Sequence, residues 1–459
     1  MPDYFAERAW LPQGWAADVR FGVDAERGEL TSVRVSANAD GAIRLNGPVI
    51  PGVPNAHSHA FQRALAGIGE SGAGFDGWRT AMYRLANALS PEQLEAVSAQ
   101  AYVELLKAGY TSVGEFHYLH HDPRGRPYRD LPEMSWRVLS AARHAGIAVT
   151  LLPVLYGYSG VGGQAPSSAQ RRFVNEPERL LHLIQRVQQE TRGQPGLRVG
   201  LAPHSLRAVT PETLGAGVEG FRRLDGTAPI HIHVAEQPGE VDGVQDWYRK
   251  RPAAWLLAQD DLVDENWTFV HCTQTTEAEV DALAARGVTV ALCPTTEANL
   301  GDGLFAADRF AARQGRMAIG SDSQVGRDPF AELRWLDYGQ RLRHGARPGL
   351  PRQQPGTSPG ADLLTRAWLG GRRALGQKVG QLVPGARADL VVLDRDVPAL
   401  TGIPDDRLLD AVLFTQPSAA VRDVIAGGRF VVEQGRHVAE DAIRRGYRQA
   451  MADLAGQLG

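Results

Sequence analysis

The hydrophobic positions of the chain fall into short, nearly continuous apolar runs, separated by longer segments of mixed polarity. Most runs are followed by polar residues and then by a stretch compatible with a helix, such as Pro91–Ala108. Strands that are apolar on both sides and alternate with helices are typical of a parallel sheet covered on both faces. The predicted strands are Gly47–Val53, Tyr110–Phe116, Ile147–Leu155, Leu197–Pro203, Pro229–Val234, Trp267–His271, Val288–Cys293 and Met317–Ser321.

Repetition of this unit along the chain predicts the fold class. Eight strand-and-helix units over roughly 320 residues match a (β/α)₈ TIM-type barrel of the α/β class, with enlarged loops. The longest of these loops is Ala60–Ser90, after the first predicted strand. A doubly wound open sheet is the alternative that the alternation alone leaves open.

The two ends of the chain show a different pattern, in which apolar and polar residues alternate and turn residues intervene. Val19–Arg44, Leu382–Asp394 and Ala411–Glu433 are therefore predicted to form antiparallel strands. We expect a small composite β-sandwich built from both chain ends, with the barrel inserted between them. The expected division is an N-terminal β part at 1–46, a metal-dependent barrel at 47–375, and a C-terminal β part with a terminal helix at 376–459.

Composition narrows the class of protein. The chain has 459 residues, is 43% hydrophobic and carries a formal net charge of −3, so it has no basic surface for nucleic acid and no electrostatic reason to bind a membrane. Its 2 cysteines cannot form a disulfide framework. The opening stretch MPDYFAERAWLPQGW lacks the pattern of a signal peptide. We therefore expect a cytoplasmic protein.

Polar side chains that suit metal binding follow several of the predicted strands. In an extended chain, residues i and i+2 point to the same face, so the two histidines of His57-Ser58-His59 can converge on one point. The carboxyl ends of barrel strands meet at one mouth, where active sites form. The residues are His57 and His59 after the first strand, His231, His233 and Glu236 on and after the fifth, His271 after the sixth and Asp322 after the eighth.

Imidazole and carboxylate ligands of this kind suit Zn²⁺, and iron or manganese would accept the same set. His57, His59, His233 and Asp322 are the predicted ligands, with His231 competing for the place of His233. One such ion lowers the pKa of a bound water towards neutrality.

Catalytic roles follow from the same set. Glu236 is placed to take a proton from water and deliver it to a leaving nitrogen. His271 and Asp322 are expected to hold the attacking water or to polarise the substrate.

The order of these residues resembles the amidohydrolase superfamily, which carries H-x-H on strand one, H-x-x-E after strand five, His on six and Asp on eight. The resemblance favours His233 over His231, because His233 stands three residues before Glu236. Binuclear members carry a carboxylated lysine at the end of strand four or three. Here Lys107 is the only lysine between His59 and His233, and it lies on a predicted helix. The resemblance therefore implies a single metal ion.

Further segments resemble a family of iminohydrolases within this superfamily that act on formimidoylglutamate. They are Asn55–Ala64, Gly114–Tyr118, Ala202–Arg207, Ser321–Gln324 and Glu332–Leu336. The resemblance implies hydrolysis of N-formimidoyl-L-glutamate to N-formyl-L-glutamate and ammonia in histidine degradation. It also implies a homodimer.

Such a substrate carries two carboxylates, so its pocket needs cationic donors away from the metal. Arg207 follows the fourth strand and Arg84 lies in the long loop after the first, so both are candidates. Tyr118 can donate its hydroxyl to a carboxylate. Gln62 and His204 are expected to bond the formimidoyl or amide part.

Two other functions remain open from the sequence. A mononuclear nucleobase or adenosine-type deaminase would share every metal ligand, but its pocket would favour stacking aromatic side chains over two arginines. The other alternative is a protein without enzymatic activity, a metal-free assembly protein with the same fold.

Overall fold

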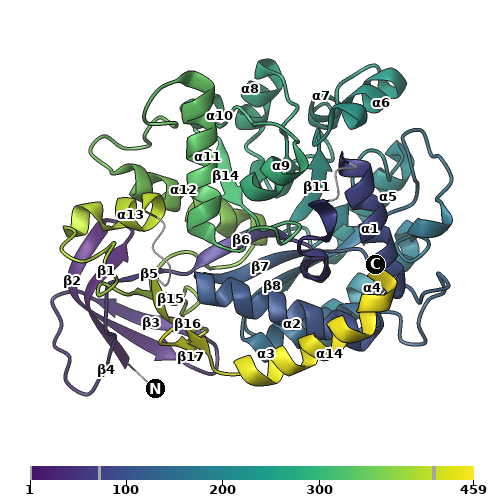
Figure 1. Ribbon diagram of the computed structural model, residues 1–459. Helices are drawn as coiled ribbons and strands as arrows, with labels where there is room; N and C mark the ends of the chain where they lie inside the picture. Colours follow the sequence, from purple (N-terminus) through teal and green to yellow (C-terminus); the bar gives the residue numbers. More distant parts are fainter. Residues whose placement is uncertain (1–2, 71–73, 416–419, 459) are drawn as a thin grey trace.

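The computed structural model describes residues 3–70, 74–415 and 420–458, and Figure 1 shows a barrel beside a separate β sheet. Two parallel sheets, β6 to β10 and β11 to β14, make up the barrel. Backbone bridges from Ser58 to Asp322 and from Leu201 to Ile230 join them into a closed barrel. The strands are β6 (Val53–Ser58), β7 (Tyr110–His117), β8 (Ala148–Leu155), β9 (Leu197–Val199), β10 (Ala202–Pro203), β11 (Ile230–Val234), β12 (Trp267–His271), β13 (Thr289–Leu292) and β14 (Arg316–Ile319).

Helices cover the outside of the barrel and the loops at its mouth (Figure 1). Several begin with a proline in the first turn behind a polar cap; Ser90, for example, accepts a hydrogen bond from the Gln93 amide at 3.1 Å. The helices are α1 (Gly74–Ala88), α2 (Pro91–Ala108), α3 (Glu133–Ala145), α4 (Pro177–Glu190), α5 (Pro211–Leu224), α6 (Pro238–Tyr248), α7 (Pro252–Leu257), α8 (Glu277–Arg286), α9 (Pro294–Leu300), α10 (Ala307–Ala312), α11 (Pro329–His344), α12 (Pro359–Leu375), α13 (Asp405–Phe414) and α14 (Glu440–Leu458), with short 3₁₀ turns η1 (Ala60–Leu65), η2 (Ile68–Glu70) and η3 (Ser168–Gln170).

Both ends of the chain build the second sheet, which has nine strands in the order β18-β17-β16-β15-β5-β1-β2-β3, with β4 beside β1. The sheet curls so that its two halves face each other across a core of their own. The Tyr4 hydroxyl donates to the Gly428 carbonyl at 2.9 Å, and its ring meets Phe430 edge-on at 5.7 Å. The strands are β1 (Asp3–Leu11), β2 (Gly14–Asp24), β3 (Glu29–Arg34), β4 (Ile43–Arg44), β5 (Val49–Pro51), β15 (Leu390–Leu393), β16 (Val421–Ala426), β17 (Arg429–Glu433) and β18 (Arg436–His437).

Two predicted strands need correction. The run Gly47–Val53 is not the first barrel strand, because its residues 49–51 form β5, which pairs with β1 and β15 in the second sheet. The barrel strand begins only at Val53, beyond Gly52. The start of Ala411–Glu433 is helical, because Leu408, Leu409, Val412 and Leu413 of α13 bury one helical face. Residues 416–419 lie outside the described part of the chain. The division at 46/47 and 375/376 stays a prediction.

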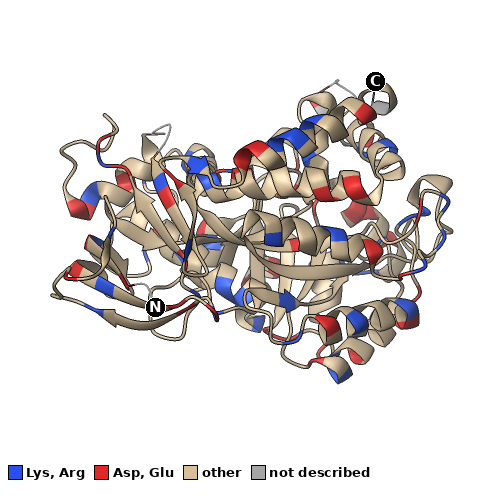
Figure 2. Ribbon diagram, turned by 90° about the horizontal axis from the view of Figure 1, so that it is seen from below, with Lys and Arg blue, Asp and Glu red and all other residues tan. Residues whose placement is uncertain are grey.

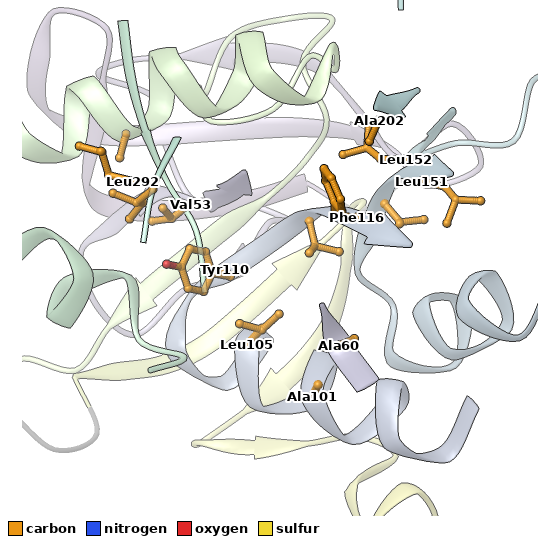
Figure 3. Close-up of a cluster of buried hydrophobic side chains, with 14 of the residues drawn as sticks. Val53, Ala60, Ala101, Leu105, Tyr110, Phe116, Leu151, Leu152, Ala202 and Leu292 are labelled. Atoms are coloured by element: carbon orange, nitrogen blue, oxygen red, sulfur yellow. The ribbon is translucent and has the colours of Figure 1, made fainter. Parts of the chain in front are cut away.

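The main core fills the space between barrel strands and outer helices (Figure 3). A separate cluster of small buried side chains, drawn from several barrel strands, includes Ala374 at the end of α12. The last carbonyls of α12 accept hydrogen bonds from barrel strands: Ala374 from the His231 Nε2 at 2.7 Å, and Leu375 from the Thr150 hydroxyl at 2.7 Å. The carboxyl end of α12 therefore closes the bottom of the barrel.

Charged side chains of both signs are interspersed over the outer helices, whereas the strands inside are largely uncharged (Figure 2). Within the described residues, no helix combines the length and apolar character that a membrane span requires.

We predict that Gly370→Ala destabilises the protein. α12 packs closely on β14 at this point, and a Cβ at Gly370 would collide with the Met317 carbonyl oxygen. Overpacking against rigid backbone should lower the free energy of unfolding by about 2 kcal/mol or more, measured by urea denaturation. Gly215→Ala on α5 is the control, because nothing lies within 4 Å of the added Cβ; it should be neutral or stabilising by up to about 1 kcal/mol. Equal stability of both variants would contradict this packing.

Candidate metal centre

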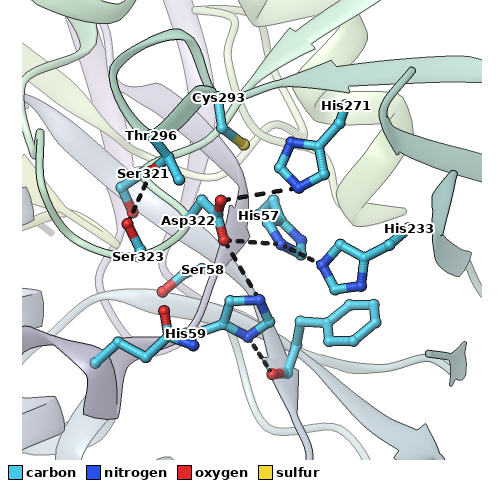
Figure 4. Close-up of polar contacts among 12 residues, drawn as sticks. His57, Ser58, His59, His233, His271, Cys293, Thr296, Ser321, Asp322 and Ser323 are labelled. Atoms are coloured by element: carbon cyan, nitrogen blue, oxygen red, sulfur yellow. Dashed lines mark hydrogen bonds and ion pairs between the residues drawn. The ribbon is translucent and has the colours of Figure 1, made fainter. Parts of the chain in front are cut away.

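The H-x-H motif lies at the end of β6, and both of its imidazoles point toward the barrel axis (Figure 4). The Nδ1 of His59 lies 2.9 Å from the Phe116 carbonyl oxygen, which can only accept. Nδ1 therefore carries the proton in the neutral ring, and Nε2 presents a lone pair to the centre.

His233 on β11 is held in the same way. Its Nδ1 donates to the His204 carbonyl at 3.0 Å, so its Nε2 also carries a lone pair. This Nε2 lies 3.1 Å from the Nε2 of His57. The candidate ligand atoms of His57, His59 and His233 all lie within 4.8 Å of one another. Imidazole nitrogens that converge in this way fit a divalent cation.

Asp322, just past β14, completes the group. Its Oδ1 is 3.4 Å from the Nε2 atoms of both His57 and His59, and its Oδ2 is 3.8 Å from the Nε2 of His271. Burial alone would raise the pKa of this carboxyl, but the surrounding imidazoles hold it well below its usual range. The carboxylate therefore stays ionised and supplies the negative charge that a cation site requires.

Backbone strain is concentrated at these strand ends. Positive φ angles at non-glycine residues occur at Ala235 (50°), His271 (70°), Cys272 (57°), Asp322 (44°) and Gln324 (66°). Each such conformation costs on the order of 1 kcal/mol and persists where the surroundings enforce it. Two of these residues, His271 and Asp322, contribute side chains to the centre.

Glu236 and His271 lie side by side next to Asp322. The Nε2 of His271 is 3.8 Å from the Glu236 carboxylate, and its Nδ1 is 3.3 Å from Glu297. Burial lowers the pKa of His271, but Glu236, Glu297 and Asp322 outweigh it and raise the value to about 10. Burial raises the pKa of Glu236, which suits a carboxylate that must both accept and return a proton.

A buried carboxylate from β7 supports the loop that carries the H-x-H motif. Glu115 accepts hydrogen bonds from the Ser58 hydroxyl (2.8 Å), the Ala60 amide (2.7 Å) and the Tyr102 hydroxyl (3.0 Å). Ser58 in turn accepts from Gln324 Nε2 at 3.0 Å. The loops after the first and last barrel strands are therefore linked directly beneath the metal centre.

A cavity opens above the centre, and the sequence had predicted many of its lining residues. It is lined by His59, Gln62, Tyr118, His204, Arg207, His233, Glu236, His271 and Asp322, together with Trp78, Arg79, Met82, Tyr83, Tyr156, Phe173 and Leu300. Gln62 donates from Nε2 to the Tyr118 hydroxyl at 2.7 Å, which leaves its buried Oε1 without a hydrogen-bond donor among the described residues. A ligand N–H group would satisfy that oxygen.

The structure does not bring Arg84 to the cavity with the other predicted residues. Arg84 is exposed on α1 and does not line the cavity, whereas Arg79 on the same helix does. Five residues advance the helix by about 140° around its axis, so the two side chains leave on different faces. Trp78, Met82 and Tyr83 share the face of Arg79, and their spacing of three and four residues is the signal that would have identified it.

His231 and His233 occupy different levels of the barrel, although they share a face of β11. The Nε2 of His231 donates to the end of α12, away from the centre. The structure thus brings His233, and not His231, to the other predicted ligands.

No lysine of the described chain lines the cavity. Lys107 lies on α2 and pairs with Glu440 at 3.0 Å. The end of the fourth strand presents His204 instead.

Fold and site together define a class of protein: a closed parallel α/β barrel with a metal-capable centre at the carboxyl ends of its strands. Residues 49–431 match the model of the amidohydrolase family, and residues 3–47 match the N-terminal domain of formimidoylglutamate deiminase HutF. The chain belongs to the amidohydrolase family, whose members are metal-dependent hydrolases.

Individual relatives agree with this. The chain is 49% identical to formimidoylglutamate deiminase of Pseudomonas aeruginosa, over 99% of this chain and 100% of the relative. It is 29% identical to a 5-methylthioadenosine/S-adenosylhomocysteine deaminase of Natronomonas pharaonis, over 95% of this chain and 93% of the relative.

Solved structures show the same fold. An amidohydrolase from Brucella melitensis, 43% identical, superposes with a TM-score of 0.91 over 99% of this chain and 100% of that one. An adenosine deaminase from Xanthomonas campestris with bound zinc, 22% identical, shares the fold with a TM-score of 0.80 over 99% and 98% of the two chains.

We predict that His233→Asn loses bound metal, because it removes one of the converging lone pairs. Zinc content of the purified protein, measured by mass spectrometry, should fall well below that of the parent. His231→Asn is the matched control on the same strand. It should retain zinc but lower the free energy of unfolding by about 1–3 kcal/mol, because the Ala374 carbonyl loses its donor. Loss of zinc in His231→Asn, with zinc retained in His233→Asn, would instead identify His231 as the metal ligand.

Proposed function

We propose that this protein hydrolyses N-formimidoyl-L-glutamate to N-formyl-L-glutamate and ammonia. The observation that carries the proposal is one cavity that holds the metal-capable centre, Glu236 and two arginines, Arg79 and Arg207. The deiminase of Pseudomonas aeruginosa, 49% identical over nearly the whole chain, supports this substrate.

His57, His59, His233 and Asp322 would hold one divalent ion, for which we propose zinc. A bound divalent ion supplies Lewis acidity and makes water a stronger nucleophile near neutral pH. The absence of lysine from the lining supports a single ion. The metal-free assembly protein is not supported, because every predicted ligand points to the same space.

The proton transfers are assigned to Glu236. Its carboxylate takes a proton from the attacking water and returns one to the departing nitrogen, which leaves as ammonia. His271 lies between Glu236 and Asp322, where its imidazolium stabilises the negative charge that develops on the substrate.

Recognition of the dicarboxylate is assigned to the arginines and their neighbours. Arg207 donates no hydrogen bond to any other described residue, so its guanidinium is available for a substrate carboxylate. Arg79 approaches the same cavity from α1. Tyr118 and His204 line the same cavity, and the Gln62 Oε1 would accept an N–H of the formimidoyl group.

An adenosine-type deaminase is the second candidate, because Trp78, Tyr83, Tyr156 and Phe173 give the cavity an aromatic lining that would suit a base. Ammonia release from formimidoylglutamate, adenosine and guanine, measured side by side with the zinc-loaded protein, separates the two. We expect turnover of formimidoylglutamate, since a neutral base would offer no carboxylate to the Arg207 guanidinium. A homodimer and a cytoplasmic location stay predictions.

Replacing Glu236 by Gln should leave zinc content unchanged and lower kcat by about 10²- to 10⁴-fold, since the amide can neither accept nor return the proton. Ammonia release and metal analysis on the same preparation provide the measurement. Glu219→Gln on the exposed side of α5 is the control and should keep full activity. Near-normal turnover of Glu236→Gln would remove the assigned role.

Replacing Arg207 or Arg79 by Met should raise KM for formimidoylglutamate about tenfold or more, because each change removes a charge-assisted hydrogen bond. Arg84→Met is the matched control: Arg84 lies on the same helix as Arg79 but does not line the cavity, so the KM of this variant should stay near that of the parent. Steady-state kinetics test this. A raised KM in Arg84→Met alone would restore the prediction from the sequence.

A further inference from the structure

A second cavity, of about 780 Å³, lies on the side of the barrel opposite the metal centre. Pro229 and Asn266, which stand directly before β11 and β12, line it, as do Arg198 of β9 and Arg316 at the start of β14. These positions are at the amino ends of the strands, whereas the metal ligands are at the carboxyl ends. The end of α12 forms another wall.

The lining of this cavity is strongly cationic. Glu265 is its single acidic residue among those described. The cationic residues are Arg198, Arg316, Arg366, Arg372, Arg373 and Lys378. Lys378 is one of only three lysines in the chain. The formal net charge of −3 for the whole protein makes this concentration of positive charge a local feature.

Half of these cations have carboxylate partners and half do not. Arg198 pairs with Asp225 at 3.0 Å, Arg366 with Asp362 at 2.7 Å, and Arg373 with Glu265 at 3.3 Å. Arg316, Arg372 and Lys378 form no ion pair with any other residue in the described part of the chain. The negative carboxyl end of a helix attracts cations, but these three residues come from β14, from α12 and from the segment after α12. The dipole of one helix therefore does not explain why all three gather here.

Buried nitrogens at the cavity lack acceptors as well. Arg366 is only 4% exposed, and its Nη1 has no hydrogen-bond partner within the described residues. The Nε of Arg198 is buried without a partner too. A buried donor without an acceptor destabilises the folded protein, so two such donors beside three cations without carboxylate partners indicate a site for an anion.

We infer that this cavity binds a small molecule carrying phosphate groups. Arginine forks match phosphate oxygens in pairs, and a phosphate monoester carries nearly two negative charges at neutral pH. The cavity volume lies in the range of small-molecule sites. The amides of Gln314, Gln353 and Gln377 also line it and would hold the uncharged part of such a molecule.

The test is calorimetric titration of the zinc-loaded protein with fructose 1,6-bisphosphate at low ionic strength. We expect one site per chain, whose affinity falls as salt is added. The double variant R372Q/K378Q should weaken binding at least tenfold, because it removes two uncompensated charges, while its hydrolytic activity stays at the parent level. The variant K250Q/R343Q makes the same change in net charge at exposed positions away from the cavity, and should bind as the parent does.

Two further measurements exclude other sites. Arg207→Met should retain bisphosphate binding, since Arg207 belongs to the opposite face. Tricarballylate, which offers carboxylates only, should bind at least tenfold more weakly. Absence of bisphosphate binding, loss of binding in Arg207→Met, equal loss in K250Q/R343Q, or equal affinity for tricarballylate would each overturn the inference. None of these outcomes depends on the substrate of the metal centre.

Discussion

One electrostatic constraint governs the catalytic mouth: three imidazoles and the carboxylate of Asp322 lie buried side by side at the ends of the barrel strands. The Nε2 atoms of His57 and His233 are 3.1 Å apart, and Asp322 is 3.4 Å from two of the rings. Backbone carbonyls hold the Nδ1 protons of His59 and His233, so the Nε2 lone pairs of these two rings face the same space as the Asp322 carboxylate. A bound cation satisfies all of these groups together, which is why the site is best understood as a metal centre.

The rest of the barrel serves to hold that arrangement. Glu115 holds the loop after β6, and Gln324 links this loop to the one after β14. Strained backbone at His271 and Asp322 turns their side chains inward, and such strain persists only where the surrounding contacts outweigh it. The histidines of this cluster differ in protonation state because their surroundings differ. His271 faces three carboxylates, which raise its pKa and hold it protonated, whereas burial lowers the pKa of His59 and His233 and holds them neutral.

α12 connects the two faces of the barrel. Gly370 allows close packing on β14, and the last carbonyls of α12 accept hydrogen bonds from His231 and Thr150 inside the barrel. Two residues beyond His231, the same strand presents His233 to the metal centre. The cationic cavity is built around the end of this helix. Both faces therefore share one structural element, although their chemistry differs.

The sequence by itself determined the barrel and the likeness to the amidohydrolase family, and it named the candidate metal ligands, because these depend on local patterns: apolar runs, and polar residues directly after them. Seven of the eight predicted runs contain barrel strands.

Tertiary structure decided the features that depend on contacts between distant parts of the chain. The run at Gly47–Val53 looked like a barrel strand, but pairing with β1 and β15 placed its middle in the other sheet. His231 and His233 share a strand face, and only their depth in the barrel separates their roles. The choice of Arg79 over Arg84 depended on the rotation of one helix above the cavity, and the cationic cavity on residues brought together from distant segments. Such contacts form between elements far apart in the chain, so no stretch of sequence contains them.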